Sequence, residues 1–351
     1  MFSSTIGRAT CATLLLASAS HVAFAENPHT RPLGDSRVVA SVPFPGYPEG
    51  IVVANKKIYV SGPANFGVPG NFVPSTIHVY DLESGAFLQD ITIQGQPSGL
   101  HALSCITADN KGNLFVVDIQ QGIVRVDAKT GEQTIYAAPF YPNFPSQFNP
   151  PAPLLPNDLA FDKKGYLYVT DTFQATIWRI PPGGGAPQIW FQNAAIDGAF
   201  GPNGIRVDEK SEKLYFAVTF DGGFAGHIYT LPLVDNPTIA DLKLFHGYEP
   251  GAGPDGLAFG KSGKLYVALA GSHQISVLSP DGTEEARYIG PATAANNTTL
   301  PWANPANLAF NDKTGALLVT NHASQVPNPE PLFAIFDVYV NDKAGKLHDS
   351  K

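Results

Sequence analysis

An internal repeat that runs along nearly the whole chain is the feature that most constrains its fold. Each copy joins a short apolar strand to a polar turn rich in Asp, Asn, Lys and Gly, and then to an alternating strand. This is the pattern of a β-hairpin. The clearest copies begin at Leu103, Pro156, Pro202, Pro254 and Ala306, and a degenerate first copy begins at Pro48. In most copies a third strand follows, as at 123–126, and then a weaker fourth, as at 188–191. Four antiparallel strands per repeat predict a propeller blade.

Six such copies predict an all-β fold, a six-bladed β-propeller with four antiparallel strands per blade. The strand 333–340 is expected to be the third of blade six, and 38–42 its fourth. The two ends of the chain would then close the ring and leave no free sheet edge. Residues 26–351 are therefore expected to form a single domain, with the long loops gathered on one face of the ring.

The first 25 residues have the pattern of a secretory signal peptide. Arg8 is followed by the apolar run 12–17 and by Ala23-Phe24-Ala25, which predicts cleavage near Ala25. The apolar run is too short to span a bilayer. We therefore expect a secreted or periplasmic protein without membrane insertion. Removal of the signal leaves Cys105 as a single cysteine in an apolar stretch, which favours a buried structural thiol.

The charge pattern argues against nucleic acid and anionic membranes as partners. The formal net charge is -8, and Lys and Arg form no run. Both of these partners require a clustered basic surface. The expected partner is a small-molecule substrate, while the oligomeric state stays open and a monomer fits the sequence.

A polar residue precedes the innermost strand of each repeat. These residues are Glu49, Asn157, Asn203, Asp255 and Asn307, with the position in the second copy near Ser104. Equivalent positions of a propeller converge on its axis. Asn and Asp after Pro also start strands through local hydrogen bonds, so any one of them has a purely structural explanation. That explanation does not cover the acidic residues of the first and fifth copies.

A central metal ion explains these acids better. A buried Glu49 needs a partner, and no Lys or Arg occupies an equivalent position in the other copies. The candidate ligands Glu49, Asn157, Asn203 and Asp255 offer only oxygen atoms, which favours one Ca²⁺ over zinc or copper. Mg²⁺ and Mn²⁺ also accept oxygen ligands and stay possible.

The repeat pattern and this ring resemble the gluconolactonase and regucalcin (SMP-30) superfamily, with its paraoxonase and diisopropylfluorophosphatase relatives. The specific part of the resemblance is the order Pro-Glu-Gly, Pro-Asn-Asp, Pro-Asn-Gly and Pro-Asp-Gly. In that family these positions hold the catalytic calcium. The Asn157-Asp158 pair is more similar to paraoxonase and diisopropylfluorophosphatase, and His101-Ala-Leu-Ser104 is similar to the stretch that carries a catalytic histidine in paraoxonases.

The chain also departs from these relatives. Ser104-Cys105-Ile106 replaces the Asn-Asp-Gly of gluconolactonases, which argues against sugar-lactone specificity. The second histidine of the paraoxonase dyad would fall at Ile119, and Gly50 removes an acid that a second calcium would need. The resemblance therefore implies one ion only.

These observations predict a calcium-dependent hydrolase of lactones or related esters. Asp255 or His101 would activate water or attack, although His101 is equally compatible with a structural hydrogen bond in a loop. Aromatic side chains in the long loops indicate a hydrophobic substrate. The residues expected around the metal and substrate are Asp158, Ser104, Asn307, His322, Phe220, Phe144 and Trp302. A non-hydrolytic enzyme similar to strictosidine synthase, and a binding propeller with structural calcium, are the alternatives.

Overall fold

The computed structural model describes residues 31–208, 210–290 and 300–345. The chain from Pro32 onward forms one compact unit. The predicted signal peptide lies outside the described residues. No helix in the described part of the chain is long and apolar enough to cross a membrane.

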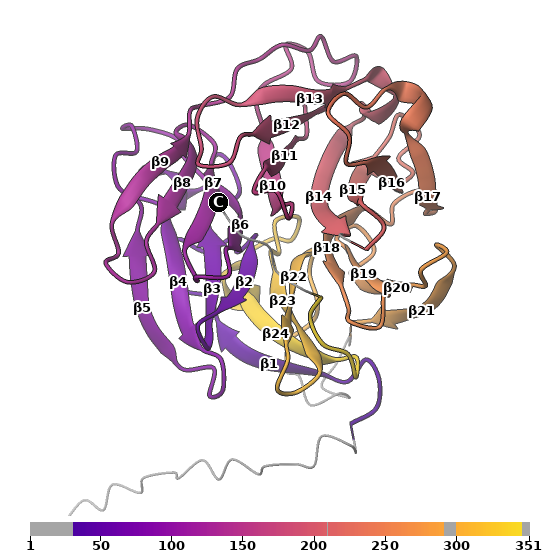
Figure 1. Cartoon of the computed structure of the whole chain (residues 1–351). Helices are drawn as coiled ribbons and strands as arrows, with labels where there is room; N and C mark the ends of the chain where they lie inside the picture. The colour runs from indigo at the N-terminus through magenta and orange to yellow at the C-terminus, as the bar shows by residue number, and fades with distance from the viewer. Residues whose placement is uncertain (1–30, 209, 291–299, 346–351) are drawn as a thin grey trace, which may run out of the picture. The chain divides into compact units, whose positions relative to one another are not determined.

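Six four-stranded antiparallel sheets surround a common axis, which confirms the predicted six-bladed propeller (Figure 1). Blade one comprises β2 (Ile51–Ala54), β3 (Lys57–Gly62), β4 (Thr76–Asp81) and β5 (Phe87–Thr92). Blade two comprises β6 (Leu103–Ala108), β7 (Leu114–Asp118), β8 (Gly122–Val126) and β9 (Gln133–Ala137). Blade three comprises β10 (Pro156–Phe161), β11 (Leu167–Asp171), β12 (Thr176–Ile180) and β13 (Gln188–Gln192).

The second half of the ring repeats this order. Blade four comprises β14 (Phe200–Asp208), β15 (Lys213–Phe220), β16 (His227–Pro232) and β17 (Lys243–Gly247). Blade five comprises β18 (Pro254–Phe259), β19 (Leu265–Leu269), β20 (Gln274–Leu278) and β21 (Glu284–Ile289). Blade six comprises β22 (Pro305–Asn311), β23 (Ala316–Asn321), β24 (Ala334–Tyr339) and β1 (Ser36–Ser41).

The pairing of β1 with β24 closes the ring as the sequence predicted. Ser36 lies opposite Val338 and Ser41 lies opposite Ala334, in antiparallel register. An early strand of the chain thus completes the last blade. This pairing gives blade six the same number of strands as the other blades.

The register of the innermost strands corrects one position of the predicted ring. In β10, Pro156 pairs with Asp171 and Leu159 with Val169. In β22 the same pattern pairs Pro305 with Asn321 and Leu308 with Val319. The residue equivalent to the one after Pro156 is therefore Ala306, and Asn307 lies one position further along. The regular spacing of the repeats concealed this shift because Pro305 follows Pro254 by one residue less than Pro254 follows Pro202.

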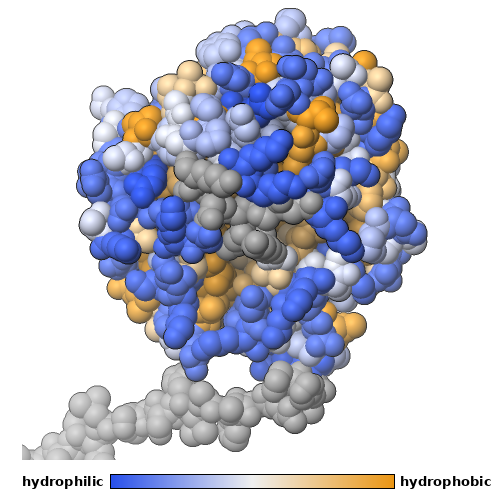
Figure 2. Space-filling view, viewed as in Figure 1, coloured by the Kyte–Doolittle hydropathy of each residue, from blue (hydrophilic) through white to orange (hydrophobic). Residues whose placement is uncertain are grey.

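Apolar side chains pack between neighbouring blades and fix the ring. Between blades two and three, for example, Phe115 and Phe161 meet edge to face at 4.9 Å, beside the fully buried Trp178. On the face seen in Figure 2, hydrophilic residues predominate, and hydrophobic residues occur singly or in small groups. The core therefore consists of the interfaces between blades, which hold the innermost strands in place around the axis.

Candidate functional site

The innermost strands bring five of the predicted ring residues together around one cavity. Glu49, Ser104, Asn157, Asn203 and Asp255 are all buried, and all line a cavity of about 310 Å³. Each lies at or just before the start of the innermost strand of its blade. The ring thus contributes one polar side chain from each of blades one to five, and the small Ala306 from blade six.

The two asparagines are oriented by hydroxyl groups. The Asn203 amide nitrogen donates to Thr219 Oγ1 at 3.0 Å, and the Asn157 amide nitrogen donates to Thr172 Oγ1 at 3.3 Å. The threonine hydroxyls in turn donate to backbone carbonyls of the following blades, at Pro254 and Pro202, both at 2.8 Å. These bonds point the amide oxygens away from the threonines, so the orientation that a metal ligand needs is set by neighbouring residues.

Several ring oxygens lack protein partners. Asn203 Oδ1 and Asp255 Oδ1 are buried and accept no hydrogen bond within the described chain. Asn157 Oδ1 faces only the Ser104 hydroxyl at 3.4 Å and the Cys105 thiol at 3.7 Å. Buried polar atoms are almost always satisfied, so these oxygens are available to a bound ion or to water in the cavity.

The electrostatics of the ring favour a cation. Burial raises the pKa of Glu49 to about 8, and the nearby Asp158 carboxylate adds to the rise. Burial also raises the pKa of Asp255 well above its usual range, with Glu49 and Asp158 contributing. A bound cation would reverse both shifts by stabilising the anions.

The donor set fits a hard divalent ion of the calcium type. Two carboxylates and two amide oxygens match the oxygen-only shell that calcium prefers. The described residues contain no cluster of three or more His, Cys, Asp or Glu side chains that could hold a metal. The ring is not such a cluster, because two of its four candidate ligands are asparagines.

His322 is the histidine that the structure brings to the cavity. Its Nδ1 atom lies 3.3 Å from Glu49 Oε2, and the side chain lines the cavity wall. Burial lowers the pKa of His322 to about 4, so the imidazole is neutral at neutral pH.

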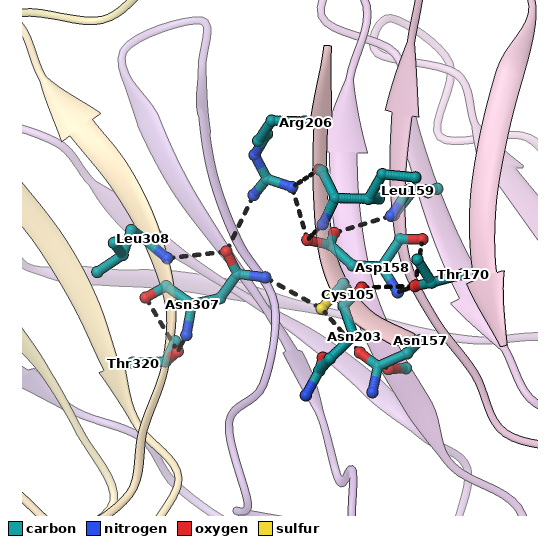
Figure 3. Close-up of polar contacts among 12 residues, drawn as sticks. Cys105, Asn157, Asp158, Leu159, Thr170, Asn203, Arg206, Asn307, Leu308 and Thr320 are labelled. Atoms are coloured by element: carbon teal, nitrogen blue, oxygen red, sulfur yellow. Dashed lines mark hydrogen bonds and ion pairs between the residues drawn. The ribbon is translucent and has the colours of Figure 1, made fainter. Parts of the chain in front are cut away.

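Asp158 and Asn307 form a second polar layer with Arg206 (Figure 3). Asp158 Oδ2 accepts from Arg206 Nη1 at 2.6 Å and from the Ile205 backbone N–H at 3.1 Å. Arg206 Nη2 donates to Asn307 Oδ1 at 3.0 Å. Asp158 is therefore engaged by an arginine and does not line the ring cavity.

Arg206 is the residue that sequence reasoning missed. The repeat does contain a signal for it. The equivalent positions of the other blades carry small or β-branched residues, namely Val52, Thr107, Ala160, Ala258 and Ala309. A charged residue at a position that is otherwise small indicates a specific partner, and that partner is Asp158.

Comparison with known proteins identifies the family of the chain. Residues 75–320 match the model of the SMP-30/gluconolactonase/LRE-like region. The chain belongs to this family. Within a stretch of 187 residues it is 27% identical to diisopropyl-fluorophosphatase of Loligo vulgaris, covering 47% of this chain and 54% of that protein. The chain thus spans about half the length of this curated relative.

Solved structures share the fold of this family member at low identity. A regucalcin described as a calcium-binding protein, from Agrobacterium tumefaciens, aligns with a TM-score of 0.65 and 17% identity, covering 90% of this chain and 97% of that one. A gluconolactonase from Xanthomonas campestris aligns with a TM-score of 0.59 and 17% identity, covering 88% and 91%. A streptogramin B lyase aligns with a TM-score of 0.51 and 16% identity, covering 87% and 97%.

The cavity wall of this family member is aromatic, but only some of the predicted residues form it. Phe220 lines the cavity as expected, and Phe66, Phe173 and Phe200 line it as well. Phe173 and Phe200 meet edge to face at 5.5 Å. Sequence position alone did not reveal Phe173, because it follows a strand within a short connection.

Two predicted wall residues belong to the packing of the blades instead. Trp302 is buried in the apolar cluster of blades five and six, and its indole N–H donates to Ser36 Oγ at 3.0 Å. Phe144 packs against the cluster between blades three and four. Neither side chain lines the ring cavity. Long loops need a packed core of their own, and these aromatic residues supply it.

His101 is likewise held away from the cavity lining. Its Nδ1 atom lies 3.2 Å from Ser75 Oγ, and its backbone carbonyl accepts from the Asn71 amide at 2.9 Å. The side chain is buried. This arrangement matches the structural alternative that the sequence left open.

Proposed function

We propose that this chain is a calcium-dependent hydrolase of lactones or related esters with hydrophobic substituents. The observation that carries the proposal is the buried ring of Glu49, Asn157, Asn203 and Asp255, whose oxygen atoms face a cavity with an aromatic wall. The relatives above include a diisopropyl-fluorophosphatase and a gluconolactonase, which supports hydrolysis as the reaction class.

Calcium bound by the ring would supply a Lewis acid that polarises the carbonyl group and stabilises the negative charge that develops on its oxygen. The residues of the chain would orient the substrate and move a proton. Asp255 has one oxygen without a protein partner, which leaves it able to accept a proton from water or to attack. Neutral His322 presents Nδ1 toward Glu49 and is the second candidate for a proton acceptor. His101 does not line the cavity, and this weakens the case for its catalytic role.

The residues that line the cavity indicate the class of substrate. Phe66, Phe173, Phe200 and Phe220 offer apolar surface, while the polar atoms are concentrated at the ring. Such a site favours aryl or long-chain lactones and esters over a polyhydroxylated sugar lactone.

The experiment that tests the proposal is hydrolysis of a panel of aryl lactones, aryl esters, gluconolactone and a phosphotriester, with chelator and with restored calcium. Turnover that disappears with chelator and returns with calcium supports the proposal. Asp255→Asn should lose most of this turnover, whereas Asp235→Asn, at a side chain that is 83% exposed, should retain it.

The same panel separates the alternatives. Tight calcium binding without any turnover would favour a binding propeller. Ring opening without addition of water would favour a non-hydrolytic reaction, a class that the fold also carries in the streptogramin B lyase.

Export is a separate part of the proposal. It rests on the signal-peptide pattern of residues 1–25. Expression of the full chain, followed by N-terminal sequencing of the protein recovered outside the cytoplasm, should give a mature start near Glu26.

A further inference from the structure

A second layer of residues lies directly beneath the ring, one position further along each innermost strand. Its members are Gly50, Cys105, Asp158, Gly204, Gly256 and Asn307. The glycines are required by close approach of the strands. A Cβ atom on Gly256 would lie 2.5 Å from the Ala306 carbonyl oxygen, and one on Gly204 would lie 2.1 Å from that of Asp255. At this strand position, therefore, only blades two, three and six carry side chains.

Arg206 enters the layer from blade four and bridges it. Its guanidinium donates from Nη1 to Asp158 of blade three and from Nη2 to Asn307 of blade six (Figure 3). Arg206 also lines a second, largely apolar cavity of about 150 Å³, whose other walls include Ile51, Ile106, Leu159 and Leu308. The Arg206 layer therefore separates the two cavities of the channel.

The charges of the channel balance only when Arg206 is counted. Three carboxylates at or next to the innermost strands are buried, those of Glu49, Asp158 and Asp255. Among the described residues that line either cavity, Arg206 is the single Lys or Arg. With Asp158 neutralised by Arg206, the two remaining negative charges match one divalent ion. Without Arg206, the buried Asp158 would need another cation, because an unpaired buried carboxylate is strongly destabilising.

Arg206 also anchors a ring ligand. Asn307, held by Arg206, donates from its amide to Cys105 Sγ at 3.0 Å, and the Cys105 thiol lies 3.7 Å from Asn157 Oδ1. Asp158, held by the same guanidinium, follows Asn157 directly in the chain. Arg206 is therefore connected to Asn157 along two routes.

We propose that Arg206 is a positioning residue and a built-in cation, which fills the place of a second metal ion beneath the ring and limits the channel to one divalent ion. The proposal rests on the metal ring of the proposed function and adds a role that the ring alone does not define. Loss of the guanidinium would free the Asp158 carboxylate and the Asn307 amide oxygen as a second set of oxygen donors.

The test is calcium binding by titration calorimetry, with bound calcium measured after dialysis. The wild-type chain should bind one ion. Arg206→Met should bind two at millimolar calcium, and the double variant Arg206→Met/Asp158→Asn should return to one. Asp158→Asn alone removes the negative charge that pairs with the Arg206 guanidinium. It should weaken calcium binding by about 10- to 100-fold. Arg179→Met, at an arginine paired with the exposed Asp235, is the control and should bind one ion.

A second measurement covers the possibility that Arg206→Met does not fold. Unfolding by urea in chelator should then show that Asp158→Asn restores folding of Arg206→Met. Failure of this rescue, or a folded Arg206→Met that binds one ion with wild-type affinity, would overturn the inference. A wild-type chain that binds no divalent ion would instead contradict the proposed function itself.

Discussion

His322 Nδ1 lies 3.3 Å from Glu49 Oε2, and both side chains line the same cavity. The contact joins the connection after β23 of blade six to the start of blade one, beside the place where the ring is closed. It brings an imidazole to the ring, whereas His101 is occupied by Ser75. The two histidines therefore have different expected roles.

We expect His322→Asn to lower turnover by about 100-fold or more, since loss of a proton acceptor typically costs that much. An asparagine amide can still donate to Glu49 but cannot take up a proton, so calcium affinity should change little. His101→Asn is the matched variant. It should keep turnover within a few fold and lower the melting temperature instead. Steady-state kinetics and thermal unfolding measure the two effects, and the reverse pattern would contradict this assignment.

A second prediction concerns the threonine that orients Asn203. Thr219→Val removes the acceptor of the Asn203 amide and the donor to the Pro254 carbonyl. Loss of such a supporting hydrogen bond should weaken calcium binding by about 10- to 100-fold. Thr230→Val, at a buried threonine of β16 in the same blade, should leave the affinity unchanged. Equal affinities for the two variants in calorimetry would show that Thr219 does not orient the ligand.

Most of the fold and part of the site could be predicted from the sequence. The sequence pattern of a β-hairpin depends only on neighbouring residues. The number of blades and the closing strand therefore follow from the order of apolar residues and turns. The ring was predictable because equivalent positions of a propeller meet at its axis. Ala306 was missed because Asn307 fits the even spacing of the repeats, whereas the strand pairing places Asn307 one position beyond the ring.

The roles of individual side chains depend on contacts between distant parts of the chain. Trp302 donates a hydrogen bond to Ser36, which lies 266 positions earlier in the chain. This contact belongs to the core of the blades and not to the cavity wall. In the sequence, His101 and His322 are both histidines in loops. Their different contacts, with Ser75 and with Glu49, appear only in the folded chain. The pairing of Arg206 with Asp158 joins two blades through an ion pair, which sequence periodicity does not describe.

A third prediction concerns pH and stability. His78 of β4 is fully buried, its Nδ1 lies 2.6 Å from Asp90 Oδ1, and burial lowers its pKa. The unfolded chain takes up a proton near pH 6.5 that the folded chain binds only at lower pH. His78 therefore contributes stability that is present above pH 6.5 and is lost as the pH falls below it.

His78→Asn should reduce this dependence, because an asparagine amide can replace the Nδ1–H donor to Asp90 and does not titrate. Urea unfolding between pH 7.5 and 4.5 should show a slope smaller than that of the wild type, by up to about 1.4 kcal/mol per pH unit. His246→Asn is the control, at a half-buried histidine that bonds to the Gly282 carbonyl. A variant at His78 with the wild-type slope would refute the prediction.

The aromatic wall gives a fourth prediction, on substrate preference. Phe66 and Phe72 lie in the same long loop between β3 and β4, and both are partly exposed, but only Phe66 lines the cavity. Burying a phenylalanine side chain against a substrate is worth about 1.5–3 kcal/mol, so Phe66→Ala should lower kcat/KM for an aryl lactone by about 10-fold or more. The value for gluconolactone should fall by less, because a polar sugar lactone gains less from an aromatic contact. Phe72→Ala should leave both values unchanged, and equal losses for the two substrates in Phe66→Ala would show that Phe66 supports the loop rather than the substrate.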